Sequence, residues 1–204
     1  MKVLDVLSAL PQLKSVRLET LITLSTQKER KALLSMEKPS LSLCEGFETI
    51  NNINFRFFNL YHSSSLEEVA PSFYYMPYAL MQSITNCHLI KKLPYDIGNL
   101  SSLKMLMLLA LPGLQELPLS IGKLGQFECL DISFCEELRE ILEEMGQLKR
   151  LNELDMRKCS HLTRSPRAIC ELNSLKLVIC DEKVWKKWLR GKNISIAELK
   201  VEID

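Results

Sequence analysis

One 24-residue pattern occurs four times between Leu93 and Asp181, and it restricts the folds open to this chain more than any other feature. Each copy opens with a stretch close to Leu-Pro-x-x-Ile-Gly-x-Leu and continues with regularly spaced apolar residues. A single copy cannot bury its own leucines, but stacked copies cover them and share one core. The apolar residues form three columns: Leu103, Phe127, Leu151 and Leu175, then Leu106, Leu130, Leu154 and Val178, then Leu108, Ile132, Met156 and Cys180.

A fixed period with LxxLxxLxL spacing is the sequence pattern of leucine-rich repeats. We therefore predict an α/β fold, a leucine-rich-repeat solenoid. Each LxL segment is expected to form a short strand whose leucines point inward. Successive strands pair in parallel and form the concave face of an arc, while short helices or turns cover the convex face.

The side chains between the inward leucines are expected to point outward and to line the concave face in columns. This face is apolar in its first repeat and charged in the middle. Such a mixture suits a protein partner, and a merely solvated face is the alternative. The predicted partner-binding residues are Met105, Met107, Leu109, Cys129, Asp131, Ser133, Glu153, Asp155, Arg157, Ile179 and Asp181.

The rest of the chain follows the repeat less closely. We assign residues 1–24 to a degenerate N-terminal repeat, 25–80 to irregular or degenerate repeats and loops, and 81–180 to regular repeats. Leu18 and Leu108 occupy equivalent positions but lie 90 residues apart, which is not a multiple of 24. At least one insertion or deletion therefore lies between them. No polar cap precedes the first repeat, so we expect the solenoid to be part of something longer.

Residues 181–204 are expected to cap the last repeat with a helix and then a strand. Val184, Trp185, Trp188 and Leu189 are apolar at helical spacing, which predicts the helix. The alternating residues 199–203 predict the strand.

Two segments before the regular repeats carry weaker signals. Residues 41–44 resemble the core of another strand. Residues 73–78 are rich in tyrosine and phenylalanine without helical or strand periodicity. These aromatic side chains either pack a convex-side loop onto the leucine core or provide a platform for a ligand.

The overall composition argues against nucleic-acid and membrane partners. Lys and Arg number 26 and Asp and Glu 25, which gives a net charge of +1. The longest apolar run, around residues 105–111, is far shorter than the roughly 20 residues that span a bilayer. Asp5 places a charge inside the segment that a signal peptide would keep apolar. We therefore expect a chain that is neither inserted in a membrane nor secreted.

The seven cysteines include no CxxC pair, which suits reduced thiols and a cytoplasmic location. Cys87, Cys135 and Cys159 occupy the same slot of the repeat. Stacked repeats would bring neighbouring Cα atoms in this slot to about 5 Å, within reach of a disulfide. We favour buried, reduced thiols that turn toward backbone groups. Leu111 takes the slot in one repeat, and the Pro112 and Gly113 that follow suggest a locally altered turn.

No sequence motif for catalysis is present. The chain has no phosphate-binding GxxxxGK[ST] loop, no GxGxxG, no GxSxG and no HExxH. His62, His88 and His161 lack metal-ligand spacing, and His88 and His161 are expected at the surface. The sequence therefore predicts neither an enzyme nor a cofactor or metal site.

The repeat form LPxxIGxLxxLxxLxLxxCxxL resembles the leucine-rich region of plant intracellular nucleotide-binding disease-resistance proteins. Residues 175–182 with Trp185 and Trp188 resemble the C-terminal end of the helper class, which carries a powdery-mildew-resistance-type coiled coil. Residues 10–18 resemble an early repeat of that class. The resemblance covers 84–188 and the first two dozen residues and is poor between them.

This resemblance implies a protein-interaction module in plant defence signalling. The implied partners are lipase-like immune signalling heterodimers or a nucleotide-binding receptor. The coiled coil and the nucleotide-binding domain of the family are absent from the sequence, so nucleotide binding and pore formation are not implied. A truncated relic without activity is one alternative.

Two further alternatives come from other classes of protein. A general cytosolic scaffold related to Ras-binding repeats would share the LPxxIGxL form. An extracellular receptor ectodomain would use Asn99 and Asn193 as glycosylation sites, but it would also need a signal peptide and paired cap cysteines. Neither of these is found in the sequence.

Overall fold

The computed structural model describes residues 78–162, residue 167 and residues 172–189, together with short strands before and after them. The predicted aromatic stretch 73–78 lies outside the described residues except for Tyr78, which is exposed. Within the described part of the chain, no helix is both long and apolar enough to cross a membrane.

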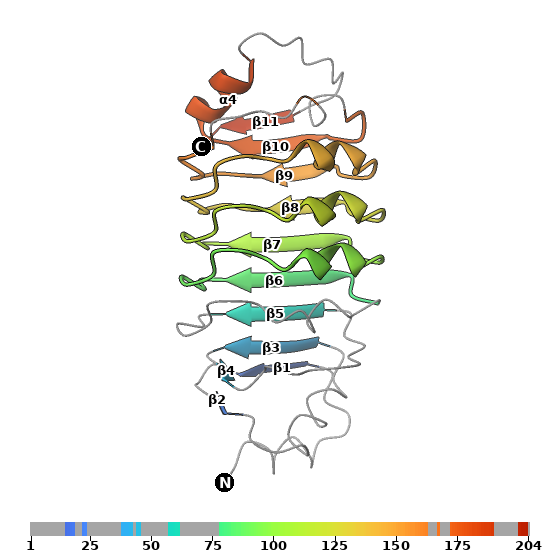
Figure 1. Ribbon diagram of the computed structural model, residues 1–204, viewed down its shortest axis with the longest axis vertical. Helices are drawn as coiled ribbons and strands as arrows, with labels where there is room; N and C mark the ends of the chain where they lie inside the picture. Colours follow the sequence, from blue (N-terminus) through green and yellow to red (C-terminus); the bar gives the residue numbers. More distant parts are fainter. Residues whose placement is uncertain are drawn as a thin grey trace.

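The protein is an α/β leucine-rich-repeat solenoid, as predicted (Figure 1). Nine described strands form one parallel sheet in the order β1-β3-β5-β6-β7-β8-β9-β10-β11, and β2 pairs with β4 beside it. The strands are β1 (Ser15–Leu18), β2 (Ile22–Thr23), β3 (Lys38–Ser42), β4 (Cys44–Glu45), β5 (Phe57–Tyr61), β6 (Met81–Thr85), β7 (Met105–Leu109), β8 (Cys129–Asp131), β9 (Glu153–Asp155), β10 (Leu177–Cys180) and β11 (Lys200–Ile203).

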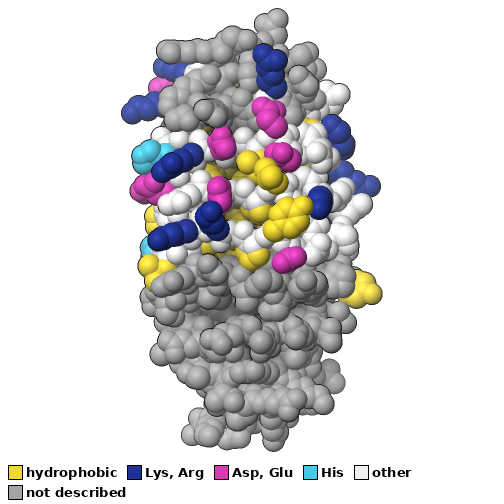
Figure 2. Space-filling view, in the orientation of Figure 1, with side chains coloured by type: hydrophobic (Ala, Val, Ile, Leu, Met, Phe, Trp, Pro, Cys, Tyr) yellow, Lys and Arg dark blue, Asp and Glu magenta, His cyan; other side chains and the backbone are white. Residues whose placement is uncertain are grey.

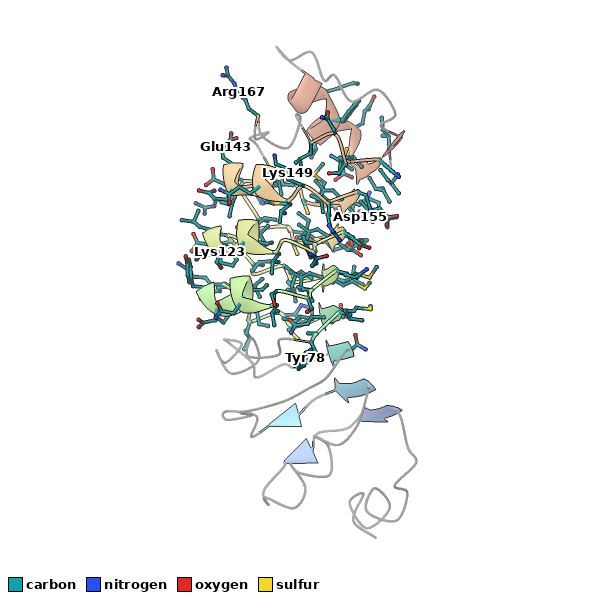
Figure 3. All side chains as sticks on the ribbon, turned by 90° about the vertical axis from the view of Figure 1, so that its right-hand side faces the viewer. Tyr78, Lys123, Glu143, Lys149, Asp155 and Arg167 are labelled. Carbon is teal, nitrogen blue, oxygen red and sulfur yellow. The ribbon has the colours of Figure 1, made fainter. Side chains whose placement is uncertain are left out.

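Short 3-10 helices lie on the opposite side of the core from the sheet (Figure 3). The helices η2 (Tyr95–Asn99) and η3 (Leu119–Lys123) begin after a proline, whose fixed φ suits the extended residue before a helix. The third, η4 (Glu143–Gln147), begins after Leu142 in the same extended conformation. We call the exposed side of the sheet the sheet face and the side with η2, η3 and η4 the helical face.

The core lies between these two layers and is formed by the predicted apolar columns. Along β7 the burial alternates, so that Leu106 and Leu108 are fully buried and the residues between them are partly exposed. The same alternation continues in β8, β9 and β10. On the helical side, Ile97, Ile121 and Met145 close the core, one from each 3-10 helix.

The strand register explains the 90-residue separation of Leu18 and Leu108. Leu18 lies beside Leu41, Leu41 beside Leu60, Leu60 beside Ile84, and Ile84 beside Leu108, which are steps of 23, 19, 24 and 24 residues. The first two of these steps are therefore shorter than the regular 24 residues, one of them by five residues. The expected strand at 41–44 is found as the end of β3 and as β4. The strand β5 was not predicted, because the 19-residue step before it takes it out of the 24-residue frame.

Each regular strand ends in the same sharp corner. Asn86, Ala110, Phe134 and Lys158, one per repeat, all have φ between 53° and 60°. The predicted altered turn at Leu111 is wrong. Ala110 before it has the left-handed φ of its counterparts, and the amide of Leu114 donates to the Leu111 carbonyl at 3.0 Å, as equivalent amides do in the neighbouring repeats. A buried leucine therefore fits the slot that cysteine fills elsewhere.

The C-terminal helix and strand are present as predicted. The helix α4 (Glu182–Leu189) buries Val184 and packs Trp185 against the core. The strand β11 extends the sheet by pairing with β10, so that Val178 lies beside Val201. The side chains of Trp188 and Leu189 lie outside the described residues. The domain boundaries at residues 24, 80 and 180 stay a prediction.

Candidate functional site: the sheet face

The structure brings most of the predicted site residues together on neighbouring strands. One row across the strands joins Met105, Cys129, Glu153 and Leu177, and the next joins Met107, Asp131, Asp155 and Ile179. A third row follows the strand ends, where the Ala110 amide donates to the Ser133 carbonyl and the Phe134 amide donates to the Arg157 carbonyl. Adjacent members of these rows lie about 4.8 Å apart, which is the spacing of paired strands.

The first part of the sheet face is apolar. Met105, Met107 and Leu109 are all partly exposed on β7. On the neighbouring β6, Ser83 and Thr85 point the same way but are buried, and their hydroxyl groups are hydrogen-bonded to each other at 3.1 Å. Met81, at the start of β6, is partly exposed beside Met105, so the apolar surface continues onto this end of β6.

The middle of the sheet face is acidic, starting at Asp131 on β8. Its Oδ1 accepts hydrogen bonds from the Ser133 amide at 2.9 Å and from the Ser133 hydroxyl at 2.6 Å. Ser133 is buried as a result and serves to orient Asp131 more than to offer a contact surface. Glu153 on β9 is exposed. Within the described part of the chain, neither Asp131 nor Glu153 makes an ion pair.

Two further carboxylates do have basic partners. Arg157 Nε lies 3.1 Å from both carboxylate oxygens of Asp155, and Nη2 lies 2.7 Å from Oδ2. Asp181 accepts a hydrogen bond from the Lys158 amide at 2.8 Å, and the Lys158 ammonium lies 3.6 Å from its other oxygen. Asp155 points away from the side on which Lys123 and Glu143 lie (Figure 3).

The half-buried thiol of Cys129 lies within this acidic group. Burial, as the largest cause, and the nearby Glu153, Asp131 and Asp155 carboxylates, which repel a thiolate, together raise its pKa to about 12. The thiol therefore stays protonated at neutral pH and is a poor nucleophile. It also shows that the three carboxylates are close enough to act on one atom.

The cysteines of the repeat slot are buried and reduced, as predicted. The Cys135 thiol donates to the Leu108 carbonyl and the Cys159 thiol to the Ile132 carbonyl, each at 3.0 Å and each across to the preceding repeat. Burial raises the pKa of the Cys135 thiol to about 12 and raises that of Cys159 as well. These thiols link neighbouring repeats and are not a reactive pair.

A cavity of about 480 Å³, which was not predicted from the sequence, lies at the C-terminal corner of the repeats. It lies where the loops after β8 and β9 meet the beginning of α4. Its lining combines residues of the corner loops with the first residues of α4, and the repeat pattern does not show that these two parts meet. The lining residues are Glu136, Lys158, Ser160, Asp181, Glu182, Lys183 and Val184.

The helical face carries an apolar patch that was also not predicted. Tyr95 and Leu119 are both more than half exposed at equivalent positions of η2 and η3. The Lys123 ammonium lies 4.9 Å from the centre of the Tyr95 ring and 2.9 Å from its hydroxyl. Figure 2, which views the molecule from this side, shows hydrophobic side chains in the middle with acidic and basic ones around them.

The described residues contain no group of three or more His, Cys, Asp or Glu side chains arranged to bind a metal ion. His88 and His161 are exposed, as predicted, and His161 Nδ1 lies 2.7 Å from the Glu136 carbonyl oxygen. His62 lies outside the described part of the chain.

Comparison with solved structures finds the same fold in leucine-rich-repeat proteins. The leucine-rich repeat domain of the type III effector XopL matches with a TM-score of 0.65 and 18% sequence identity, over 98% of this chain and 79% of that one. An internalin C2 from Listeria monocytogenes matches with a TM-score of 0.52 and 13% identity, over 85% and 83%. An internalin (inlF) from the same organism has a TM-score of 0.50 and 11% identity, over 96% and 69%.

No protein-family model matches the sequence, and the comparison with curated proteins finds no match either. At identities below 20%, the structural matches concern the fold alone.

Proposed function

We propose that this chain is a protein-interaction module that binds its partner on the sheet face. One observation carries the proposal. Across β7, β8 and β9 the inward residues stay apolar, while the outward residues change from methionine to aspartate and glutamate. The core requires only the inward residues, so the outward ones are free to fit a partner. The alternation of apolar and charged surface is typical of a protein interface.

The resemblance of the repeats to plant disease-resistance proteins supports a more specific role. We infer that the module acts in plant defence signalling, in the cytoplasm and without catalysis. Its proposed partner is a lipase-like immune signalling heterodimer or a nucleotide-binding receptor. The buried, reduced cysteines of the repeat slot support a reducing compartment.

Site-specific photo-crosslinking tests this proposal. A photoreactive amino acid replaces Met107 on the sheet face or, as the matched control, Leu119 on the helical face. Both positions are outward and apolar, so neither change removes a buried side chain. In plant extract, we expect a crosslinked partner from position 107 and none from position 119.

The double variant Asp131→Arg/Asp155→Arg provides the second arm of this test. It should abolish the crosslink from position 107, provided that its circular dichroism spectrum matches that of the parent. Recovery of a lipase-like protein or a nucleotide-binding receptor would support the defence role, and recovery of a small GTPase would support the general scaffold. A folded protein that captures nothing from either position would contradict the interaction module.

A further inference from the structure

We propose that the occupant of the sheet face is an extended segment of a partner protein that carries an apolar side chain followed by arginine or lysine. This inference rests on the proposed function and adds the chemistry of the partner. It follows from the change in the outward residues across three adjacent strands, which are apolar on β7 and include the acidic side chains on β8 and β9.

The apolar end of this surface can bind a hydrophobic side chain. Met105, Met107 and Leu109 lie on one strand and are all partly exposed, so they form a continuous apolar strip along β7. Methionine is flexible and adapts its shape to different apolar partners. Covering this strip removes apolar area from water, which favours binding.

The acidic end requires a basic partner. The outward residues of β8 and β9 and of their ends include the carboxylates of Asp131, Glu153 and Asp155 against one basic side chain, Arg157. Arg157 is bound to Asp155, which leaves the charges of Asp131 and Glu153 without an ion pair in the described part of the chain. An acidic or neutral segment would bury these two charges without compensation. A guanidinium or ammonium group would neutralise them.

The strand spacing determines the distance between the apolar side chain and the basic residues in the partner segment. Met105 and Glu153, which makes no ion pair in the described part of the chain, are two strands apart in one row, which is about 10 Å. An extended chain rises about 3.3 Å per residue, so the basic residues should begin about three residues from the apolar one. A segment of this pattern would cross the strands and contact all three.

Fluorescence anisotropy with synthetic peptides tests the proposal on the full chain. The probe is a labelled peptide of about ten residues in which two leucines are followed, about three residues on, by two arginines. One control peptide replaces both arginines with glutamate, and a second places the arginines directly beside the leucines. We expect the probe to bind at least about tenfold more tightly than the glutamate peptide and about threefold more tightly than the respaced one.

Charge-neutral variants identify the site. Asp131→Asn retains the oxygen that accepts the Ser133 hydrogen bonds, and Glu153→Gln is isosteric, so the double variant removes charge with little change of shape. It should weaken probe binding about tenfold and reduce the dependence of binding on salt. The matched control Glu116→Gln/Glu137→Gln removes two exposed charges elsewhere and should leave binding unchanged.

Three results would overturn the inference. They are equal affinity for the glutamate peptide, an equal loss in the Glu116→Gln/Glu137→Gln control, and no saturable binding of the probe below about 1 mM. If any of these occurs while position 107 still crosslinks a natural partner, the interaction module stands and only the partner chemistry fails. If position 107 also captures nothing, the proposed function itself has failed.

Discussion

The strands β7 and β9 both turn a buried leucine inward, but their outward residues differ in character. Both bury a leucine of the second column, Leu106 in one and Leu154 in the other. Outward, β7 presents methionine and leucine, whereas β9 presents glutamate and aspartate. The backbone register is continuous between them through β8. The comparison shows that the inward positions determine the fold and that the outward positions can vary without disturbing it.

The largest expected effect is a loss of stability when the buried leucine that β7 and β9 share is shortened to alanine. Leu106→Ala and Leu154→Ala each remove a fully buried side chain from the stacked core. Each should lower the free energy of unfolding by about 3 kcal/mol, as large-to-small core substitutions do. Denaturation by urea, followed by circular dichroism, measures both.

The matched outward control is Met107→Ala, which should cost less than about 1 kcal/mol because the side chain is already partly exposed. The two inward losses should agree within about 1 kcal/mol. A loss at Leu154 much smaller than that at Leu106 would mean that the acidic region is not packed on the same core.

A second prediction concerns the close packing of neighbouring repeats on the helical face, where η3 lies against η4. A Cβ added to Gly122 would lie 2.5 Å from the Glu144 carbonyl oxygen of the next repeat. Gly122→Ala must therefore push η3 and η4 apart, and it should cost about 2 kcal/mol. Gly125 has no atom within 4 Å of an added Cβ, so Gly125→Ala is the control and should be nearly neutral. Equal melting temperatures for the two variants would contradict the close contact between repeats.

A third prediction tests the thiols that connect neighbouring repeats at the corners. Burial raises the pKa of Cys135 in the folded state from its ordinary value of 9.0 to about 12. The folded state therefore favours the neutral thiol, so its contribution is complete below pH 9 and is lost as the pH rises from 9 toward 12. At pH 10 the loss from this one thiol is about 1 kcal/mol.

The variant Cys135→Ser provides the reference for this pH effect. Its hydroxyl keeps a donor for the Leu108 carbonyl but does not titrate in this range. The difference in unfolding free energy between the parent and Cys135→Ser should shrink by about 1 kcal/mol between pH 8 and pH 10. A difference that is independent of pH would show that the thiol is not buried in its neutral form.

The sequence predicts the features that repeat and misses those that do not. The columns of Leu106, Leu130 and Leu154 predict the sheet, its parallel pairing and its outward rows, because one spacing determines all three. The repeat before β5 is five residues shorter than the regular repeat, so the 24-residue spacing is lost there. No local sequence feature marks the position of the deletion. At Leu111 the neighbouring proline and glycine suggested an altered turn, but a buried leucine fits the same corner.

The candidate site shows the same limit. Periodicity places Asp131, Asp155 and Met107 in one row, but it does not show that Ser133 is buried beneath the Asp131 carboxylate or that Arg157 is bound to Asp155. These contacts depend on side-chain rotamers that the repeat pattern does not specify. The cavity beside α4 is formed where residues of the corner loops meet the first residues of that helix, and no periodic signal brings the two together, so it could be found only in the structure.

The smallest expected effect is that of Asp131→Asn, which should raise stability while it weakens peptide binding. Asp131 and Asp155 lie directly opposite each other on β8 and β9, and like charges in such a pair destabilise a sheet. Asp131→Asn keeps the acceptor for Ser133 and removes this repulsion, so it should raise the free energy of unfolding by up to about 0.5 kcal/mol at low salt. The gain should shrink at high salt, where the repulsion is screened.

Glu137→Gln, which neutralises an exposed charge in a corner loop, is the control and should change stability by less than the Asp131 variant. Urea titrations at low and high salt, run beside the peptide-binding assay, measure both quantities on the same samples. A gain in stability together with a loss of peptide affinity would mean that the acidic outward residues are maintained at a cost to the fold, as expected for a binding surface. A loss of stability above about 1 kcal/mol in Asp131→Asn would instead assign the carboxylate to the fold, through its charged hydrogen bonds with Ser133.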